Sequence, residues 1–384
     1  MAPHRAASQF LKARPDASSF RVTLYGSLAA TGKGHMTDVA IREALSAHTV
    51  EIIWKPSEEL PLHANGMRLE ALEESGCVLG TREEYSVGGG ALLSDELLPD
   101  IYPAKTLSEI LAHCERSGQS FWEYVIHFEG DAFWSFLDEI WTAMCGTIEN
   151  GLNSEGTLPG GLGLFRKARS FLRKSTIMGP EFSCDALLAA YAYAVAEENA
   201  CGSRIVSAPT CGSSGVLPAV LYYLKSKLDC TRVDITRALA TAGLFGNIVK
   251  SNGSISGAAV GCQGEVGTAC AMAAAAATQL LGGSPRQIEY AAEMGLEHHF
   301  GLTCDPVRGL VQIPCIERNA HAAARAVSCC HFALLSDGLH RISFDDAVLV
   351  LVETGQALPK LFRETSAGGL ARIYEKRIAA QRAS

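Results

Sequence analysis

The chain contains 384 residues, of which 33 are basic and 41 acidic, so its formal net charge is −8. This charge excludes the basic surface that nucleic-acid binding requires, and we expect no nucleic-acid partner. The thirteen cysteines are an odd number and no apolar signal-peptide core accompanies them, which argues against a disulfide framework and favours a cytoplasmic protein.

At this length we expect two domains, and the first is predicted to be small. Residues 1–19 are polar and are predicted to be a disordered N-terminal segment. Residues 20–98 are predicted to form an α+β domain, because alternating segments typical of strands surround one helix. The expected strands are 21–25, 50–54, 67–72 and 84–87, and the expected helix is 37–47.

Residues 99–384 are predicted to form a larger, all-helical domain, so the fold class is α+β. The boundary is placed within residues 95–105, where two prolines interrupt a segment without periodicity. Residues 266–283 are mostly alanine, which predicts a buried helix, and we expect no membrane span. The expected helices are 107–117, 119–129, 132–150, 164–173, 185–199, 217–227, 234–245, 266–281, 284–296, 320–336 and 344–361.

Three cysteines lie at predicted breaks in the backbone of the second domain. Cys262 lies in Gly-Cys-Gln-Gly-Glu, Cys304 in Thr-Cys-Asp-Pro, and Cys315 in Ile-Pro-Cys-Ile-Glu. Glycine and proline leave backbone N–H groups free to point at bound sulfide or at an anion. The spacing matches neither a zinc pair nor a ferredoxin run. Three thiolates without a clear fourth indicate an iron–sulfur cluster with one open iron, although each cysteine taken alone could be a buried structural thiol.

The segments around these cysteines resemble the iron–sulfur-dependent L-serine dehydratases of bacteria, also called L-serine ammonia-lyases. Residues 252–267 and 301–319 carry the resemblance, and further motifs extend it over nearly the whole chain. These motifs are residues 25–38, 60–67, 85–90, 153–160 and 207–220. The resemblance implies a single-chain enzyme in which a β-type domain precedes an α-type domain.

The resemblance implies a [4Fe-4S] cluster held by Cys262, Cys304 and Cys315, because each occupies the cysteine of its family motif. It also implies that the chain deaminates L-serine to pyruvate and ammonia. Loss of water from serine expels hydroxide, a poor leaving group that needs a Lewis acid or a covalent cofactor. We expect a homodimer, the commonest assembly of soluble enzymes.

His35 is the candidate catalytic residue. It lies on a predicted loop before a helix, where a histidine can act as an acid or base near neutral pH, and the matching histidine of the family is considered catalytic. A histidine that only caps a helix or a turn is the alternative. Asn65, Ser254 and Ser256 are predicted to bind the substrate through neutral hydrogen bonds, although Asn-Gly is also a common hairpin turn.

The sequence departs from the family pattern near both ends. Family members carry a motif like Gly-Pro-Ser-Ser-Ser-His-Thr that helps form the substrate site, and residues 1–19 contain no such motif. We expect this difference to affect turnover more than folding. Some members end in a cysteine that binds the open iron, whereas residues 368–384 contain none, so water, substrate or another group is expected there.

Two other functions stay open at this stage. A pyridoxal-phosphate-dependent lyase would use the serine- and glycine-rich loop 207–215 for the phosphate and a lysine such as Lys250 for the Schiff base. This alternative leaves the three cysteine motifs without a role. A non-catalytic iron–sulfur paralogue, acting as a scaffold or sensor, would keep the cysteines but not turn over serine.

Overall fold

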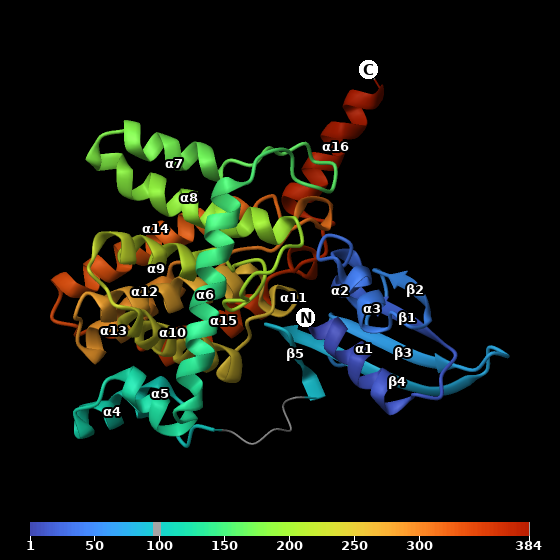
Figure 1. Cartoon of the computed structure of the whole chain (residues 1–384), viewed down its shortest axis with the longest axis horizontal. Helices are drawn as coiled ribbons and strands as arrows, with labels where there is room; N and C mark the ends of the chain where they lie inside the picture. The colour runs from blue at the N-terminus through green and yellow to red at the C-terminus, as the bar shows by residue number, and fades with distance from the viewer. Residues whose placement is uncertain (95–100, 384) are drawn as a thin grey trace.

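The structure is a computed structural model that describes residues 1–94 and 101–383. A small part containing a β-sheet precedes a larger helical part, which confirms the predicted α+β class (Figure 1). The expected boundary between residues 98 and 99 lies outside the described residues, so the domain limits stay a prediction.

The N-terminal part is built around a five-stranded sheet of order β2-β1-β3-β4-β5. Strands β1 and β2 pair in parallel, and the other neighbours pair antiparallel. All four predicted strands and the predicted helix are present, although β4 begins at Val78 and not at the predicted residue 84. The elements are α1 (Ala2–Ala13), β1 (Ser19–Tyr25), α2 (Gly26–Ala30), α3 (Thr37–Ala44), β2 (Thr49–Lys55), β3 (Gly66–Leu72), β4 (Val78–Gly88) and β5 (Ala91–Leu92).

Residues 1–19, which we expected to be disordered, instead contain helix α1 and the first residue of β1. Ala2, Ala6 and Phe10 recur every four residues, so they form one buried stripe along the helix. This stripe packs against α3 and the sheet, and it belongs to the same core as residues of β1 and β3. The prediction failed because alanine gives only a weak hydrophobic signal, although three alanines on one face bury well.

The helical part contains every helix predicted for it, with shifts at the ends. Additional helices are α11 and α16, together with short turns of other helix types labelled η. The elements are α4 (Leu107–Ser117), α5 (Phe121–Glu129), α6 (Ala132–Asn153), α7 (Ala168–Ile177), α8 (Pro180–Ala200), α9 (Val216–Lys227), α10 (Arg232–Asn252), α11 (Gly257–Val260), η2 (Gln263–Gly267), α12 (Thr268–Leu280), α13 (Pro285–Glu297), η3 (Val307–Gly309), α14 (Cys315–Leu335), α15 (Phe344–Ala357), η4 (Lys360–Phe362) and α16 (Gly369–Ala383).

Helix α12 is the centre of the helical part. Every residue from Thr268 to Thr278 is buried, as the alanine-rich sequence predicts. Helices α9, α10, α13 and α14 contact it, since alanine side chains let neighbouring backbones approach closely. None of the helices in the described part of the chain is long and apolar enough to cross a membrane.

The two parts meet through backbone contacts that depend on glycine. A Cβ atom on Gly34 would collide with the carbonyl oxygen of Gly309, and a Cβ atom on Gly309 would lie 2.7 Å from the carbonyl oxygen of Ala30. Gly309 also has a φ of +69°, in the left-handed region that favours glycine. These contacts place the loop before α3 directly against the loop that follows Cys304.

Candidate active site

The three predicted cysteines lie together in the helical part, although they come from separate segments. Cys262 precedes the π-helical turn η2, Cys304 lies in the loop after α13, and Cys315 is the first residue of α14. All three thiols are free and buried. Cys262 and Cys315 therefore lie at the starts of helical segments, where the helix dipole favours negative charge on a nearby thiolate.

Buried hydrogen bonds fix the segment that carries Cys262. Gly261 has a φ of +76°, and a Cβ atom there would lie 2.8 Å from the carbonyl oxygen of Leu302. The amide of Gln263 donates to the carbonyl of Leu351 at 2.8 Å and accepts from the N–H of Gly301 at 2.7 Å. Gln263 thus joins the turn after Cys262 to α15 and to the loop that leads to Cys304.

A segment near the C-terminus holds Cys304. We call residues 358–368, between α15 and α16, the strap. Cys304 donates its backbone N–H to the carbonyl of Phe362 at 2.8 Å and accepts from the N–H of Glu364 at 2.6 Å. Glu364 has a φ of +56°, which is unusual for a residue other than glycine. The strap therefore pairs with Cys304 like a short parallel strand and directs the side chain of Glu364 towards the site.

The first turn of α14 connects Cys315 to the loop of residues 207–215. Asn319 donates to the carbonyls of Cys315 and Gly212, and its side-chain oxygen accepts from the N–H of Gly215 at 2.8 Å. Arg318, on the same turn, donates to the carbonyl of Thr303 at 2.6 Å. This geometry brings the guanidinium of Arg318 close to the thiols.

The charge around the thiols favours at least one thiolate. A hydrogen bond from the Cys304 thiol and the positive charge of Arg318 lower the pKa of Cys262 to about 7, although burial opposes them. The same hydrogen bond, together with burial, raises the pKa of Cys304 well above its usual value. Burial likewise raises the pKa of Cys315. Arg318 is the cation that can balance negative charge gathered on these sulfur atoms.

Glu265 links the thiols to a neighbouring cavity. Its carboxylate lies 3.7 Å from the Cys304 thiol and accepts a hydrogen bond from the hydroxyl of Thr210 at 2.7 Å. Burial, followed by the negative charge of Cys262, raises the pKa of Glu265 well above its usual value. Gly257 leaves room for this contact, because a Cβ atom there would lie 2.5 Å from Glu265 and 3.2 Å from the sulfur of Cys304.

The cavity beside Glu265 has a volume of about 150 Å³ and lies between the two parts of the chain. A cavity of this size holds a molecule of about six non-hydrogen atoms, such as benzene. Polar side chains from both parts and from the strap line it. They include Thr31, His35, Asn65, Ser86, Ser207, Thr210, Ser256, Glu265 and Glu364, and Met1, Ala2 and Pro3 also contribute.

His35 lies where the sequence predicted, on the loop just before α3, and it lines the cavity. Its Nε2 atom lies 3.5 Å from a carboxylate oxygen of Glu364. The hydroxyl of Ser27 donates to the backbone carbonyl of Glu364 at 2.7 Å. The strap is thereby fixed to the N-terminal part on one side and to Cys304 on the other.

Of the three residues predicted to bind substrate, two line the cavity and one does not. Asn65 and Ser256 both line the cavity. Ser254 is not among its lining residues, and its hydroxyl accepts the backbone N–H of Ser256 at 3.1 Å. The role of Ser254 in substrate binding stays a prediction, and the structure gives it a contact that positions Ser256.

Four residues of the site were not assigned a role from the sequence: Thr210, Glu265, Arg318 and Glu364. Glu265 and Arg318 each follow a predicted ligand cysteine by three residues, which is a signal that could have identified them. Glu364 gave no such signal, because only the path of the strap brings it to His35.

Two family models and several known proteins match this chain over most of its length. A family model described as "Serine dehydratase alpha chain" matches residues 59–371, and one described as "Serine dehydratase beta chain" matches residues 1–53. The "L-serine dehydratase" of Streptomyces coelicolor is 40% identical, over 92% of this chain and 89% of that protein. "L-serine dehydratase 1" of Escherichia coli is 40% identical, over 91% and 88%. The "L-serine dehydratase" of Helicobacter pylori is 34% identical, over 92% and 90%.

Proposed function

The chain belongs to the bacterial L-serine dehydratase family, and from this premise we propose that it is a lyase that deaminates L-serine to pyruvate and ammonia. The observation that supports this proposal most directly is the position of the cavity. It has the size of a small polar metabolite, and His35, Asn65 and Ser256 line it. Glu265 joins it to the thiol of Cys304.

We further propose that Cys262, Cys304 and Cys315 hold a [4Fe-4S] cluster. The donor set fits, because three buried free thiols from separate segments gather beside the cation Arg318. Within residues 1–94 and 101–383, no three His, Cys, Asp or Glu side chains converge tightly enough to hold a single metal ion, so a zinc-type site fits less well. When bound, the cluster would supply a Lewis acid for the departing hydroxide.

Side chains of the cavity would carry out substrate binding and proton transfer. Asn65 and Ser256 bind the polar groups of serine, and His35 moves the proton of the substrate. If Nε2 of His35 donates to Glu364, Nδ1 carries the lone pair that can accept this proton. Enclosure of the substrate between the two parts would exclude water and so strengthen each of these polar contacts.

Reconstitution distinguishes the proposed functions. We expect the full chain, loaded anaerobically with iron and sulfide, to show a broad visible absorption that air bleaches and to convert L-serine to pyruvate. A sharp aldimine band removed by hydroxylamine would instead identify a pyridoxal-phosphate enzyme. Lys250 does not line the cavity beside Glu265, but it lines a neighbouring cavity together with Ser207, so this spectrum decides the alternative. A fully loaded protein that makes no pyruvate would identify the scaffold or sensor.

Gly257→Ala should impair cluster loading without unfolding the chain. The added Cβ would lie 2.5 Å from the carboxylate of Glu265 and 3.2 Å from the sulfur of Cys304, so both groups must shift to make room. We expect less iron per chain after reconstitution, measured together with the melting temperature. Gly146→Ala on α6 is the control, since open space surrounds that position and iron content should not change. A Gly257→Ala protein with normal iron content would refute the close packing described here.

The remaining expectations concern assembly and location. The homodimer stays a prediction based on the frequency of dimers among soluble enzymes. The cytoplasmic location stays a prediction based on the composition.

A further inference from the structure

The cavity beside Glu265 contains two carboxyl groups, those of Glu265 and Glu364, and no lysine or arginine is among the described residues that line it. Glu265 is already engaged by its neighbours. One of its oxygens accepts the hydroxyl of Thr210 at 2.7 Å, and the other lies 3.7 Å from the thiol of Cys304. Glu364 is therefore the carboxyl group that a ligand of this cavity can use.

Glu364 has no comparable partners. Its side chain is only 13% exposed, yet its carboxylate accepts no hydrogen bond from any residue of the described chain. Its ion-pair contact is with Nε2 of His35 at 3.5 Å, which is longer than an ordinary hydrogen bond. Neither carboxylate oxygen is sealed from solvent, so a ligand in the cavity can reach them. A cation that supplied the missing hydrogen bonds would stabilise this carboxylate.

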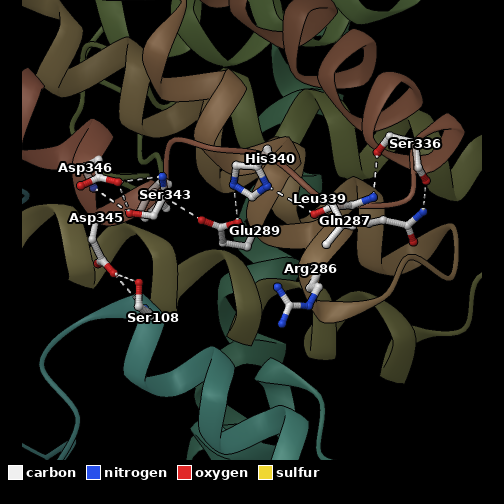
Figure 2. Close-up of polar contacts among 12 residues, drawn as sticks. Ser108, Arg286, Gln287, Glu289, Ser336, Leu339, His340, Ser343, Asp345 and Asp346 are labelled. Carbon is white, nitrogen blue, oxygen red and sulfur yellow. Dashed lines mark hydrogen bonds and ion pairs between the residues drawn. The ribbon is translucent and has the colours of Figure 1, made fainter.

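A second histidine–glutamate pair shows what a fully paired carboxylate looks like in the same chain. One oxygen of Glu289, on α13, accepts the backbone N–H of Phe344 at 2.6 Å (Figure 2). The other oxygen lies 2.8 Å from Nε2 of His340. Glu364 has neither a backbone donor nor such a short contact, so its capacity to accept hydrogen bonds is unused.

The backbone of Glu364 is held in an unfavourable conformation that keeps its carboxylate in the cavity. Its φ of +56° lies in the left-handed region. Its N–H donates to the carbonyl of Cys304 at 2.6 Å, and its carbonyl accepts the hydroxyl of Ser27 at 2.7 Å. Both parts of the chain therefore contribute to holding this residue. Strained residues that are held in this way are concentrated at active sites and ligand-binding sites.

Unpaired hydroxyl groups line the same cavity. Thr37, the first residue of α3, is 4% exposed, and Ser256 is 3% exposed. Neither hydroxyl forms a hydrogen bond with a described residue, and neither oxygen is sealed, so both are available to a ligand in the cavity. Hydroxyl groups can donate hydrogen bonds to a carboxylate, for which the lining offers no basic side chain.

We propose that Glu364 binds the ammonium group of the substrate and that the hydroxyls of Thr37 and Ser256 bind its carboxylate. The identity of the substrate rests on the proposed function, whereas the assignment of its two charged groups rests on the contacts above. Pyruvate keeps the carboxylate but has no ammonium group, so Glu364 favours binding of the substrate over binding of this product.

Binding of two unreactive ligands to the reconstituted full chain tests the proposal. L-Alanine has the ammonium and carboxylate groups of serine but no hydroxyl to expel, and propionate is L-alanine without the ammonium group. The wild type should bind L-alanine about 10- to 100-fold more tightly than propionate, the usual effect of a hydrogen bond between charged groups. Glu364→Gln should remove most of this preference by weakening the binding of L-alanine alone. Calorimetric titration measures both affinities without turnover.

Further variants separate the two charged groups of the ligand. Thr37→Val should weaken L-alanine and propionate by a similar factor, since both carry the carboxylate. Glu364→Asp keeps the charge and should retain part of the preference for L-alanine. Glu139→Gln on α6 and Thr176→Val on α7 are the matched controls, because both residues are exposed and neither lines the cavity, so both affinities should stay unchanged.

Each part of the proposal has a result that overturns it. Equal affinities of the wild type for the two ligands, or an unchanged preference in Glu364→Gln, would remove the ammonium group from Glu364. A lower kcat with unchanged affinity for L-alanine would assign Glu364 to orienting His35 alone. Unchanged affinities in Thr37→Val would remove Thr37 from the carboxylate site. A wild type that shows the preference but makes no pyruvate would refute the proposed reaction and leave this binding assignment intact.

Discussion

Replacement of Cys262, Cys304 or Cys315 by serine is expected to abolish cluster loading and, with it, the formation of pyruvate. Each thiol comes from a different segment, so no neighbouring cysteine can take its place without moving the backbone. The hydroxyl of serine is a poor ligand for iron that prefers soft sulfur donors. Iron and sulfide per chain, measured after anaerobic reconstitution, report the loss directly.

Cys211→Ser is the matched control for these three variants. Cys211 lines the cavity beside Glu265, and its thiol lies 3.5 Å from the hydroxyl of Ser207, so it is a nearby cysteine outside the proposed ligand set. Its iron content should equal that of the wild type. Normal iron content in any of the three ligand variants would remove that cysteine from the set.

His35→Asn is expected to lower kcat by about 10²- to 10⁴-fold, the usual loss when a positioned proton-transfer residue is removed. His35 contacts Glu364 and lines the cavity, whereas the cysteines proposed as ligands lie beyond Glu265. The visible spectrum of the loaded protein should therefore stay unchanged while pyruvate formation falls. His4→Asn on α1 controls for loss of a histidine, because His4 does not line the cavity. A kcat within a few-fold of the wild type would assign His35 to a structural role.

Much of the fold could be predicted from the sequence because its signals are local. Alternating residues identified β1 to β4, and helical periodicity identified the long helices from α4 to α15. Helix α1 was missed, since its buried stripe consists mainly of alanine. Helix α16 was missed for a related reason, because its many charged residues obscure any apolar face.

Sequence signals likewise identified some residues of the candidate site and missed others. Cys262, Cys304, Cys315 and His35 stood in motifs rich in glycine or proline, so the sequence alone singled them out. Glu364 lies 337 positions from Ser27, with which its backbone forms a hydrogen bond, and no local pattern reports a contact of that range. Contacts of that kind become visible only when the complete chain is folded.

The strap is translated after all three cysteines, so the complete site can form only late in synthesis. All three cysteines precede residues 358–368, so a ribosome that adds about 5–20 residues per second exposes the thiols before the segment that pins Cys304 exists. The helices around α12 can pack in that interval, but the backbone pairing of Cys304 and the carboxylate of Glu364 cannot yet form. A nascent chain stalled at this point would lack the backbone pairing that fixes Cys304 and the carboxylate that contacts His35. Translation of the strap therefore completes both the segment that carries Cys304 and one wall of the cavity.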